Sequence, residues 1–141
     1  VADRWRGWAD PRFAVLVLHN ADLAEVSWEQ REMEGDPRFA ASQSVPSFRY
    51  ADYAELLGLR AIRITRSADA AEAWRAAFAA DRPILIEALT DPAVPLLPPN
   101  LSKAKADKVI GAMSAEPDAD RTHLVSMRHG LDPGRDGPAA G

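Results

Sequence analysis

The sequence predicts an α/β fold with three layers, in which a partial parallel sheet is flanked by helices. Three short runs of strand-forming residues, 13–18, 61–65 and 84–89, are separated by segments with helical spacing. Strands that alternate with helices are joined by right-handed crossovers, which give a parallel sheet. The 141 residues correspond to one domain, since domains usually hold about 100 to 200 residues.

The first run, 13–18, is continuously apolar and is therefore typical of a central strand that is covered on both faces. It ends at His19, and the polar residues Asn20 and Asp22 follow directly. In open α/β sheets, ligands bind outside the carboxyl ends of the strands. The turn after this strand is therefore the first place where we expect a site.

The segments between and after the strands predict helices. One short helix is expected over 23–33, before Gly35, and residues 38–48 are expected to form a long loop. Gly58 is placed where a helix commonly ends in a left-handed residue. Ser67 is a candidate cap for a later helix. Apolar residues at helical spacing define the predicted faces of three helices: Tyr50, Tyr53, Ala54 and Leu57; Ala70, Trp74, Ala77 and Phe78; Ala106, Val109, Ile110 and Met113.

The two ends of the chain carry separate expectations. Val1 is not methionine, and Trp5 and Trp8 are spaced as on the last turns of a helix, so we expect a missing amino-terminal part. An alternative start codon would equally give valine. Residues 1–114 are expected to form the folded domain and 115–141 a disordered tail, which holds half of all glycines.

Composition excludes several classes of function. The 17 basic and 21 acidic residues give a net charge of −4, which is the wrong sign for a nucleic-acid partner. No apolar run reaches the roughly 18 residues of a membrane helix. Cysteine is absent, which excludes disulfides and thiolate zinc sites and is compatible with the reducing cytoplasm, where we expect the protein. The three histidines lack the paired spacing of helical zinc sites.

The turn that contains Asn20 and Asp22 could hold a metal ion. An asparagine amide oxygen and a backbone carbonyl are hard oxygen ligands, and these suit magnesium. The alternative interpretation is a simple turn in which Asn20 and Asp22 bond to their own backbone. Glu25, Glu29 and Glu32 fall near helical spacing, and we interpret them as a solvated helix face.

Six segments in order resemble one enzyme family. The resemblance is to the thiamine-diphosphate-dependent enzymes, in the carboxyl-terminal part of the cofactor-binding domain of the pyruvate oxidase and acetolactate synthase group. It covers about residues 5–105. The segments are VLVLHNADL (15–23), VSWEQR (26–31), MEGDP (33–37), YADYAELLG (50–58), DRPILIE (81–87) and DPAVPLLPP (91–99).

The resemblance implies roles for individual residues. Asn20 would bind Mg²⁺ through its side chain and Asp22 through its main-chain carbonyl, with the cofactor diphosphate completing the coordination; His19 stands where the group has a first asparagine. Leu23 would lie against the cofactor. Val26, Trp28 and Glu29 would lie towards the thiazolium and the substrate, although local packing is an equal alternative for Val26 and Trp28.

The resemblance also implies what this sequence does not contain. The family's motif opens with Gly-Asp-Gly, which supplies a carboxylate ligand and a diphosphate cradle, and these 141 residues hold only its closing half. The family also needs a glutamate from a separate pyrimidine-binding domain to activate the cofactor. We therefore expect an incomplete thiamine-diphosphate-binding fold, inactive as an isolated chain, that needs the rest of the enzyme or a homo-oligomer. Any flavin (FAD) would be held by a different domain.

Two classes of function remain open at this point. The first is the carboxyl-terminal part of an enzyme that decarboxylates or ligates pyruvate or another 2-keto acid. The second is a non-catalytic α/β module that packs against another chain. The downstream segments favour the first, and the absent Gly-Asp-Gly favours the second as a description of this polypeptide.

Overall fold

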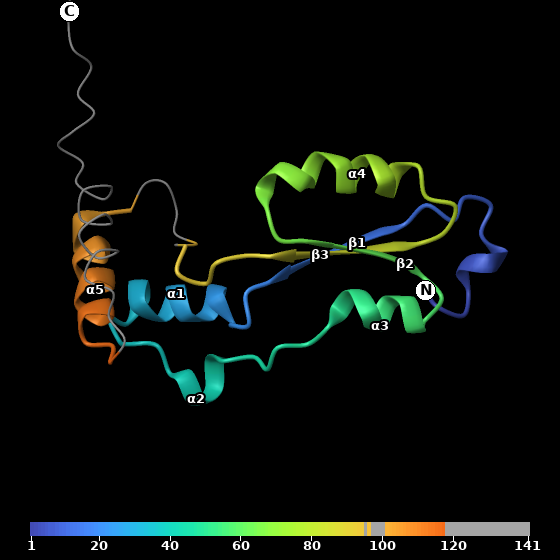
Figure 1. Cartoon of the computed structure of the whole chain (residues 1–141). Helices are drawn as coiled ribbons and strands as arrows, with labels where there is room; N and C mark the ends of the chain where they lie inside the picture. The colour runs from blue at the N-terminus through green and yellow to red at the C-terminus, as the bar shows by residue number, and fades with distance from the viewer. Residues whose placement is uncertain (95, 97–100, 118–141) are drawn as a thin grey trace, which may run out of the picture. The chain divides into compact units, whose positions relative to one another are not determined.

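The computed structural model describes residues 1–94, 96 and 101–117 (Figure 1). The chain divides into two compact units. The first, here called the sheet unit, comprises residues 1–21 and 46–92. The second, here called the helical unit, comprises residues 22–45 and the described part of 93–141. Each unit is built around its own core.

The sheet unit contains three parallel strands, β1 (Ala14–His19), β2 (Arg60–Ile64) and β3 (Ile84–Leu89), in the order β1-β3-β2. Helix α4 (Ala70–Phe78) covers one face of the sheet and helix α3 (Tyr50–Leu56) the other (Figure 1). The predicted α/β class, the parallel sheet and its flanking helices are confirmed. Because the strands are parallel, their carboxyl ends meet at one edge, where the pocket described below opens.

The prediction that the first strand is central is wrong. The middle position belongs to β3, in which Ile84 and Ile86 are almost completely buried. Strand β1 pairs with β3 alone among the described residues, and its Leu16 and Leu18 are 44% and 62% exposed. An apolar run shows that its side chains can be buried. Which of several apolar strands is central depends on pairing with strands far along the chain.

Helix α4 presents a different face to the sheet from the one predicted. Its buried residues are Ala73 and Ala77, whereas Trp74 and Phe78 are exposed and stack on each other at 5.8 Å. Small alanines let the helix approach the sheet closely, and the large rings are excluded from that space. Ser67 does not cap this helix: it opens a 3-10 turn, η2 (Ser67–Asp69), and the first turn of α4 has no side-chain cap.

The buried face of helix α3 also differs from the predicted one: Ala51 and Ala54 are buried, whereas Tyr53 and Leu57 are 49% and 37% exposed. Helix α3 is followed by Gly58 at φ +74°, in the left-handed region, as its position predicted. Near the amino end, the predicted last turns of a helix are a single 3-10 turn, η1 (Trp5–Gly7).

The helical unit contains α1 (Ala24–Met33), α2 (Ala40–Gln43) and α5 (Lys103–Ser114). Helices α1 and α5 lie side by side (Figure 1). Helices α1 and α5 were predicted, whereas the short α2 lies in the segment that was expected to be a loop. Four side chains form the core between α1 and α5: Ala24, Trp28, Val109 and Met113.

The interpretation of the α1 glutamates as a solvated face needs one correction. Glu25 and Glu29 are exposed as expected. Glu32 is only 7% exposed and forms an ion pair with Lys105 of α5 at 2.6 Å. A partner 73 residues away brings this carboxylate into the unit, and spacing along one helix cannot reveal such a contact.

The predicted disordered tail, 115–141, lies largely outside the described residues, because 118–141 are not described. Within the described part of the chain, no helix has both the length and the apolar character needed to cross a membrane.

Candidate functional site at the carboxyl edge of the sheet

A pocket of about 250 Å³ opens in the sheet unit at the carboxyl ends of the strands. Residues from all three strands contribute to it, together with the segment before α3. This edge of a parallel sheet is where ligands are expected to bind. The lining residues are His19, Asn20, Ala21, Ser47, Arg63, Leu89 and Thr90.

The turn after β1 has an unusual backbone. Asn20 follows the last residue of the strand and lines the pocket. Ala21 has φ +54°, in the left-handed region that a residue with a Cβ seldom adopts. Such conformations persist only when the surroundings fix them, and they gather at functional sites.

A buried carboxylate contacts His19, the last residue before this turn. Glu87 of β3 is 1% exposed, and its Oε1 lies 2.6 Å from Nδ1 of His19. Its Oε2 accepts a hydrogen bond of 3.0 Å from the backbone N–H of Ala51, and Nε of Arg63 lies 3.8 Å from Oε1. Burial opposes ionisation, but these hydrogen bonds and the charge of Arg63 outweigh it and hold the pKa of Glu87 below its ordinary value. The carboxylate is therefore ionised at neutral pH.

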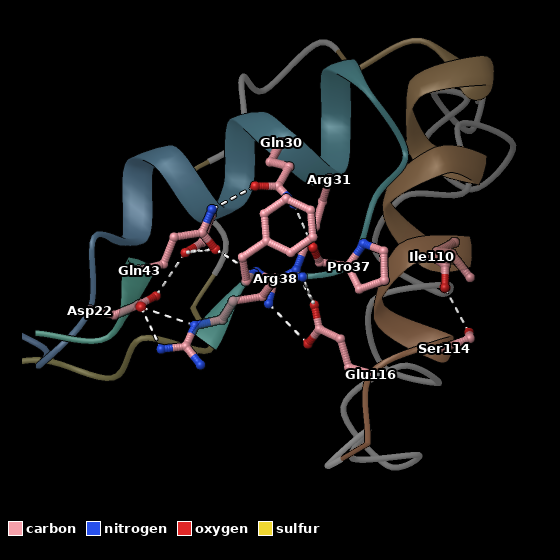
Figure 2. A network of polar contacts seen from close by, with 11 residues as sticks. Asp22, Gln30, Arg31, Pro37, Arg38, Gln43, Ile110, Ser114 and Glu116 are labelled. Carbon is pink, nitrogen blue, oxygen red and sulfur yellow. Dashed lines mark hydrogen bonds and ion pairs between the residues drawn. The ribbon is translucent and has the colours of Figure 1, made fainter. Parts of the chain in front are cut away.

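In the helical unit, the side chain of Asp22 is bound by its neighbours (Figure 2). Nε and Nη2 of Arg38 donate to Oδ1 of Asp22 at 2.9 and 2.6 Å, and the hydroxyl of Ser27 donates to Oδ2 at 3.1 Å. The Asp22 side chain is 5% exposed. This carboxylate is therefore occupied by structural contacts.

The same view shows a second anchor of Arg38 (Figure 2). Its backbone N–H donates to Oε1 of Glu116 at 2.9 Å, and Glu116 also accepts two hydrogen bonds from Arg31, at 2.8 and 3.0 Å. Glu116 thereby fixes the segment that carries Arg38 to the end of α5. These contacts join parts of the unit that lie about 80 residues apart.

Comparison with known protein families shows which family the chain belongs to. The family model described as "Thiamine pyrophosphate enzyme, C-terminal TPP binding domain" matches residues 9–88. The chain belongs to this family. The match spans β1, the turn after it, and the strands that line the pocket, so the family assignment and the pocket concern the same part of the chain. A search of curated proteins gives no match to this chain.

The sequence placed several more residues at the site of this thiamine pyrophosphate (TPP) domain, and they lie in the helical unit. Leu23 and Val26 are 46% and 49% exposed, and Glu29 is also exposed. Trp28 is 1% exposed in the core, with the Arg31 guanidinium 4.5 Å from its ring centre. For Trp28 the structure therefore favours the packing alternative.

Two residues of the pocket region were missed by sequence reasoning. Glu87 is the one acidic residue in the apolar run 84–89, and that contrast was the available indication of a special role. Arg63 in β2 carried no comparable indication, because a charged side chain is ordinary at an exposed position. Neither residue belongs to a motif that predicts ligand binding.

The donor chemistry at this turn is compatible with Mg²⁺. Asn20 offers an amide oxygen, and a main-chain carbonyl is a second hard oxygen of the kind that Mg²⁺ accepts. No group of three or more His, Cys, Asp or Glu side chains that could hold a metal occurs among the residues the structure describes. A magnesium ion here would take its remaining ligands from water and from the phosphate oxygens of the cofactor.

Proposed function

We propose that this domain binds TPP with Mg²⁺ at the turn after β1. Asn20 holds the metal through its side-chain oxygen, Asp22 through its main-chain carbonyl, and Leu23 lies against the cofactor. The position of Asn20 carries the proposal: it follows a parallel strand, lines the pocket and falls within the residues that match the TPP family. The occupied carboxylate of Asp22 is consistent with ligation through its backbone.

We further propose that the complete enzyme acts on pyruvate or another 2-keto acid, by decarboxylation or carboligation, as in the pyruvate oxidase and acetolactate synthase group. TPP itself supplies the chemistry of breaking or forming a bond beside the keto group, and the protein supplies binding and orientation. The order and spacing of the six segments, rather than any single residue, support this assignment. Val26 and Glu29, both exposed, are the proposed substrate-side residues.

The proposed site draws on more than these 141 residues. They contain no Gly-Asp-Gly segment, and the metal ligands that we propose are neutral oxygens. Neutral oxygens alone bind Mg²⁺ weakly, because the ion gives up its hydration shell reluctantly. We therefore expect weak cofactor binding and no turnover by the chain alone. Catalysis would require other domains or chains, and FAD, where the enzyme uses it, would bind to one of those.

Calorimetric titration tests the cofactor proposal. The chain is titrated with TPP in excess Mg²⁺, beside an Asn20→Ala variant and an exposed control, Glu55→Ala. We expect saturable binding that Asn20→Ala abolishes and Glu55→Ala retains. Equal binding by all three proteins would contradict the role of Asn20. No heat of binding at millimolar TPP would contradict cofactor binding by this chain.

A second candidate function is a non-catalytic module that packs against another chain. The open edge of β1 favours it, because Leu16 and Leu18 are exposed beside backbone groups that no described strand pairs. Sedimentation measurements distinguish the two candidates. A module of this kind self-associates or captures a partner without TPP, whereas the cofactor proposal requires Mg²⁺-dependent TPP binding in any state of association.

A further inference from the structure

We propose that Glu87, acting through His19, is a positioning residue for Asn20. Neither Glu87 nor His19 touches the cofactor in this proposal. Their role is to fix the end of β1, so that the amide oxygen of Asn20 is presented to the metal in one orientation. The inference rests on the proposed function of Asn20, and it makes a separate prediction about the ligand-free protein.

His19 is held from three directions. Its ring Nδ1 lies 2.6 Å from Oε1 of Glu87. Its carbonyl oxygen accepts a hydrogen bond of 3.1 Å from the backbone N–H of Thr90. The ring of Tyr50 packs edge-on against the imidazole, with 5.2 Å between ring centres. Asn20 is the next residue in the chain, so any movement of the His19 backbone would also move Asn20.

The turn needs such an anchor because its backbone is strained. Ala21, directly after Asn20, adopts φ +54°. This conformation is unfavourable for a residue with a Cβ and relaxes unless its surroundings oppose the relaxation. On one side of Ala21, the contacts of His19 provide that opposition. Loosening them would let Asn20 and Ala21 move to an ordinary turn.

Glu87 is itself rigidly placed. It is 1% exposed, it accepts the N–H of Ala51 at 3.0 Å, and Arg63 lies beside it at 3.8 Å. It therefore connects the central strand β3 with β1 and α3. A carboxylate in water could not hold an imidazole in one orientation, whereas a buried carboxylate with a second hydrogen bond can, because it has few other partners. Acidic partners of ligand-bearing segments commonly act in this way.

The ligand-free protein provides the first test. Resonances of the Asn20 side-chain amide and of the Ala21 backbone amide are compared by ¹⁵N NMR in the wild type, in Glu87→Gln and in Glu55→Gln. The matched control removes the same charge from an exposed position in α3. We expect Glu87→Gln to shift or broaden both resonances and Glu55→Gln to leave them unchanged. Unchanged resonances in Glu87→Gln would overturn the inference, whatever the protein binds.

A conservative rescue provides the second test. The Nδ2 of an asparagine at position 19 would lie at the same distance along the side chain as Nδ1 of His19. We expect His19→Ala to weaken Mg²⁺-dependent TPP binding about tenfold and His19→Asn to restore most of it at an unchanged melting temperature. We also expect Glu87→Gln to cause no further loss of TPP affinity in the His19→Ala background, because both substitutions remove the same contact between Glu87 and His19. Fully additive losses, or no rescue by asparagine, would overturn the inference.

The two tests keep the proposals distinguishable. If the wild type binds no TPP, the cofactor proposal fails for this chain, and the resonances of the ligand-free protein still decide the positioning role. If Glu87→Gln does not fold, the His19→Ala and His19→Asn spectra decide it. If TPP binds and Asn20 matters, but neither His19 variant changes the Asn20 resonance or the affinity, only the positioning role is overturned.

Discussion

The sheet unit and the helical unit are stabilised in different ways. The core of the sheet unit consists of small or medium side chains, including Ala73, Ala77, Ile84 and Ile86, and its strands are joined by parallel pairing. The core of the helical unit is built around one large ring, Trp28. Packing free energy is therefore distributed over many residues in the first unit and concentrated in one in the second.

Polar contacts extend this contrast. In the sheet unit they converge on one buried carboxylate, Glu87, close to the pocket. In the helical unit they include ion pairs that join the region of α1 to that of α5, Glu32 with Lys105 and Arg31 with Glu116, and a separate pair between Arg38 and Asp22. The sheet unit therefore combines a distributed core with one polar centre at the candidate site, whereas the polar pairs of the helical unit are spread over several of its segments.

Removing the large ring should break the helical unit. We expect Trp28→Ala to cost about 3 to 5 kcal/mol of stability, because it deletes a fully buried aromatic side chain. Unfolding in urea, followed by circular dichroism, measures the loss. Trp74, which is 37% exposed on α4 and stacks on Phe78, is the control, and Trp74→Ala should cost clearly less than Trp28→Ala because less of its ring is buried. Equal losses in the two variants would contradict the concentrated core.

Removing the buried carboxylate should give the largest polar effect in the sheet unit. We expect Glu87→Ala to cost about 1 to 3 kcal/mol, since the N–H of Ala51 and Nδ1 of His19 lose their acceptor. Exposed Glu55→Ala should change stability by about 0.5 kcal/mol or less. Urea unfolding of both variants tests this. A stability of Glu87→Ala equal to that of the wild type would mean that the network contributes nothing to folding.

A smaller effect is expected for the ion pairs of the helical unit. Arg31 stacks on Trp28 and forms two hydrogen bonds with Glu116. We expect Arg31→Lys to cost about 1 kcal/mol, because an ammonium group retains the charge but neither the planar stack nor the paired bonds. The melting temperature in low and high salt checks this. A variant as stable as the wild type in both conditions would show that charge alone suffices.

The smallest predicted effect is a dependence on pH that belongs to the sheet unit. The folded pKa of Glu87 is lower than the ordinary value of 4.5, so its ionised form stabilises the folded state. That contribution is present above the ordinary pKa and is lost as the pH falls through the folded pKa. His19 and Arg63 are the charged or titratable groups that face it. Unfolding measured from about pH 6 down to pH 3 should show a weaker acid loss in Glu87→Gln than in Glu55→Gln.

The sequence predicted what is decided locally. Spacing and residue type indicate the strands, their alternation with helices and the left-handed Gly58. The parallel sheet could therefore be predicted from the sequence. The turn with Asn20 was found because polar residues interrupt an apolar run. Ligand roles came from the resemblance, since no spacing rule distinguishes a metal ligand from a turn residue.

What the sequence could not predict depends on contacts far along the chain. The edge position of β1 is set by its pairing with β3, some 70 residues away. Burial of Trp28 depends on α5, and Arg38 reaches Asp22 only after the chain has folded back. The role of Glu87 was missed for the same reason, because its partners lie on β1, β2 and α3.

The most direct test of the central claim is to locate the metal with Mn²⁺ in place of Mg²⁺. Mn²⁺ broadens the NMR resonances of nearby protons, so adding it with TPP to ¹⁵N-labelled protein identifies the residues at the site. The account predicts that Asn20, Ala21 and Asp22 broaden first, that broadening requires TPP, and that Asn20→Ala prevents it. Broadening centred on other residues, or the same broadening without TPP, would contradict the account.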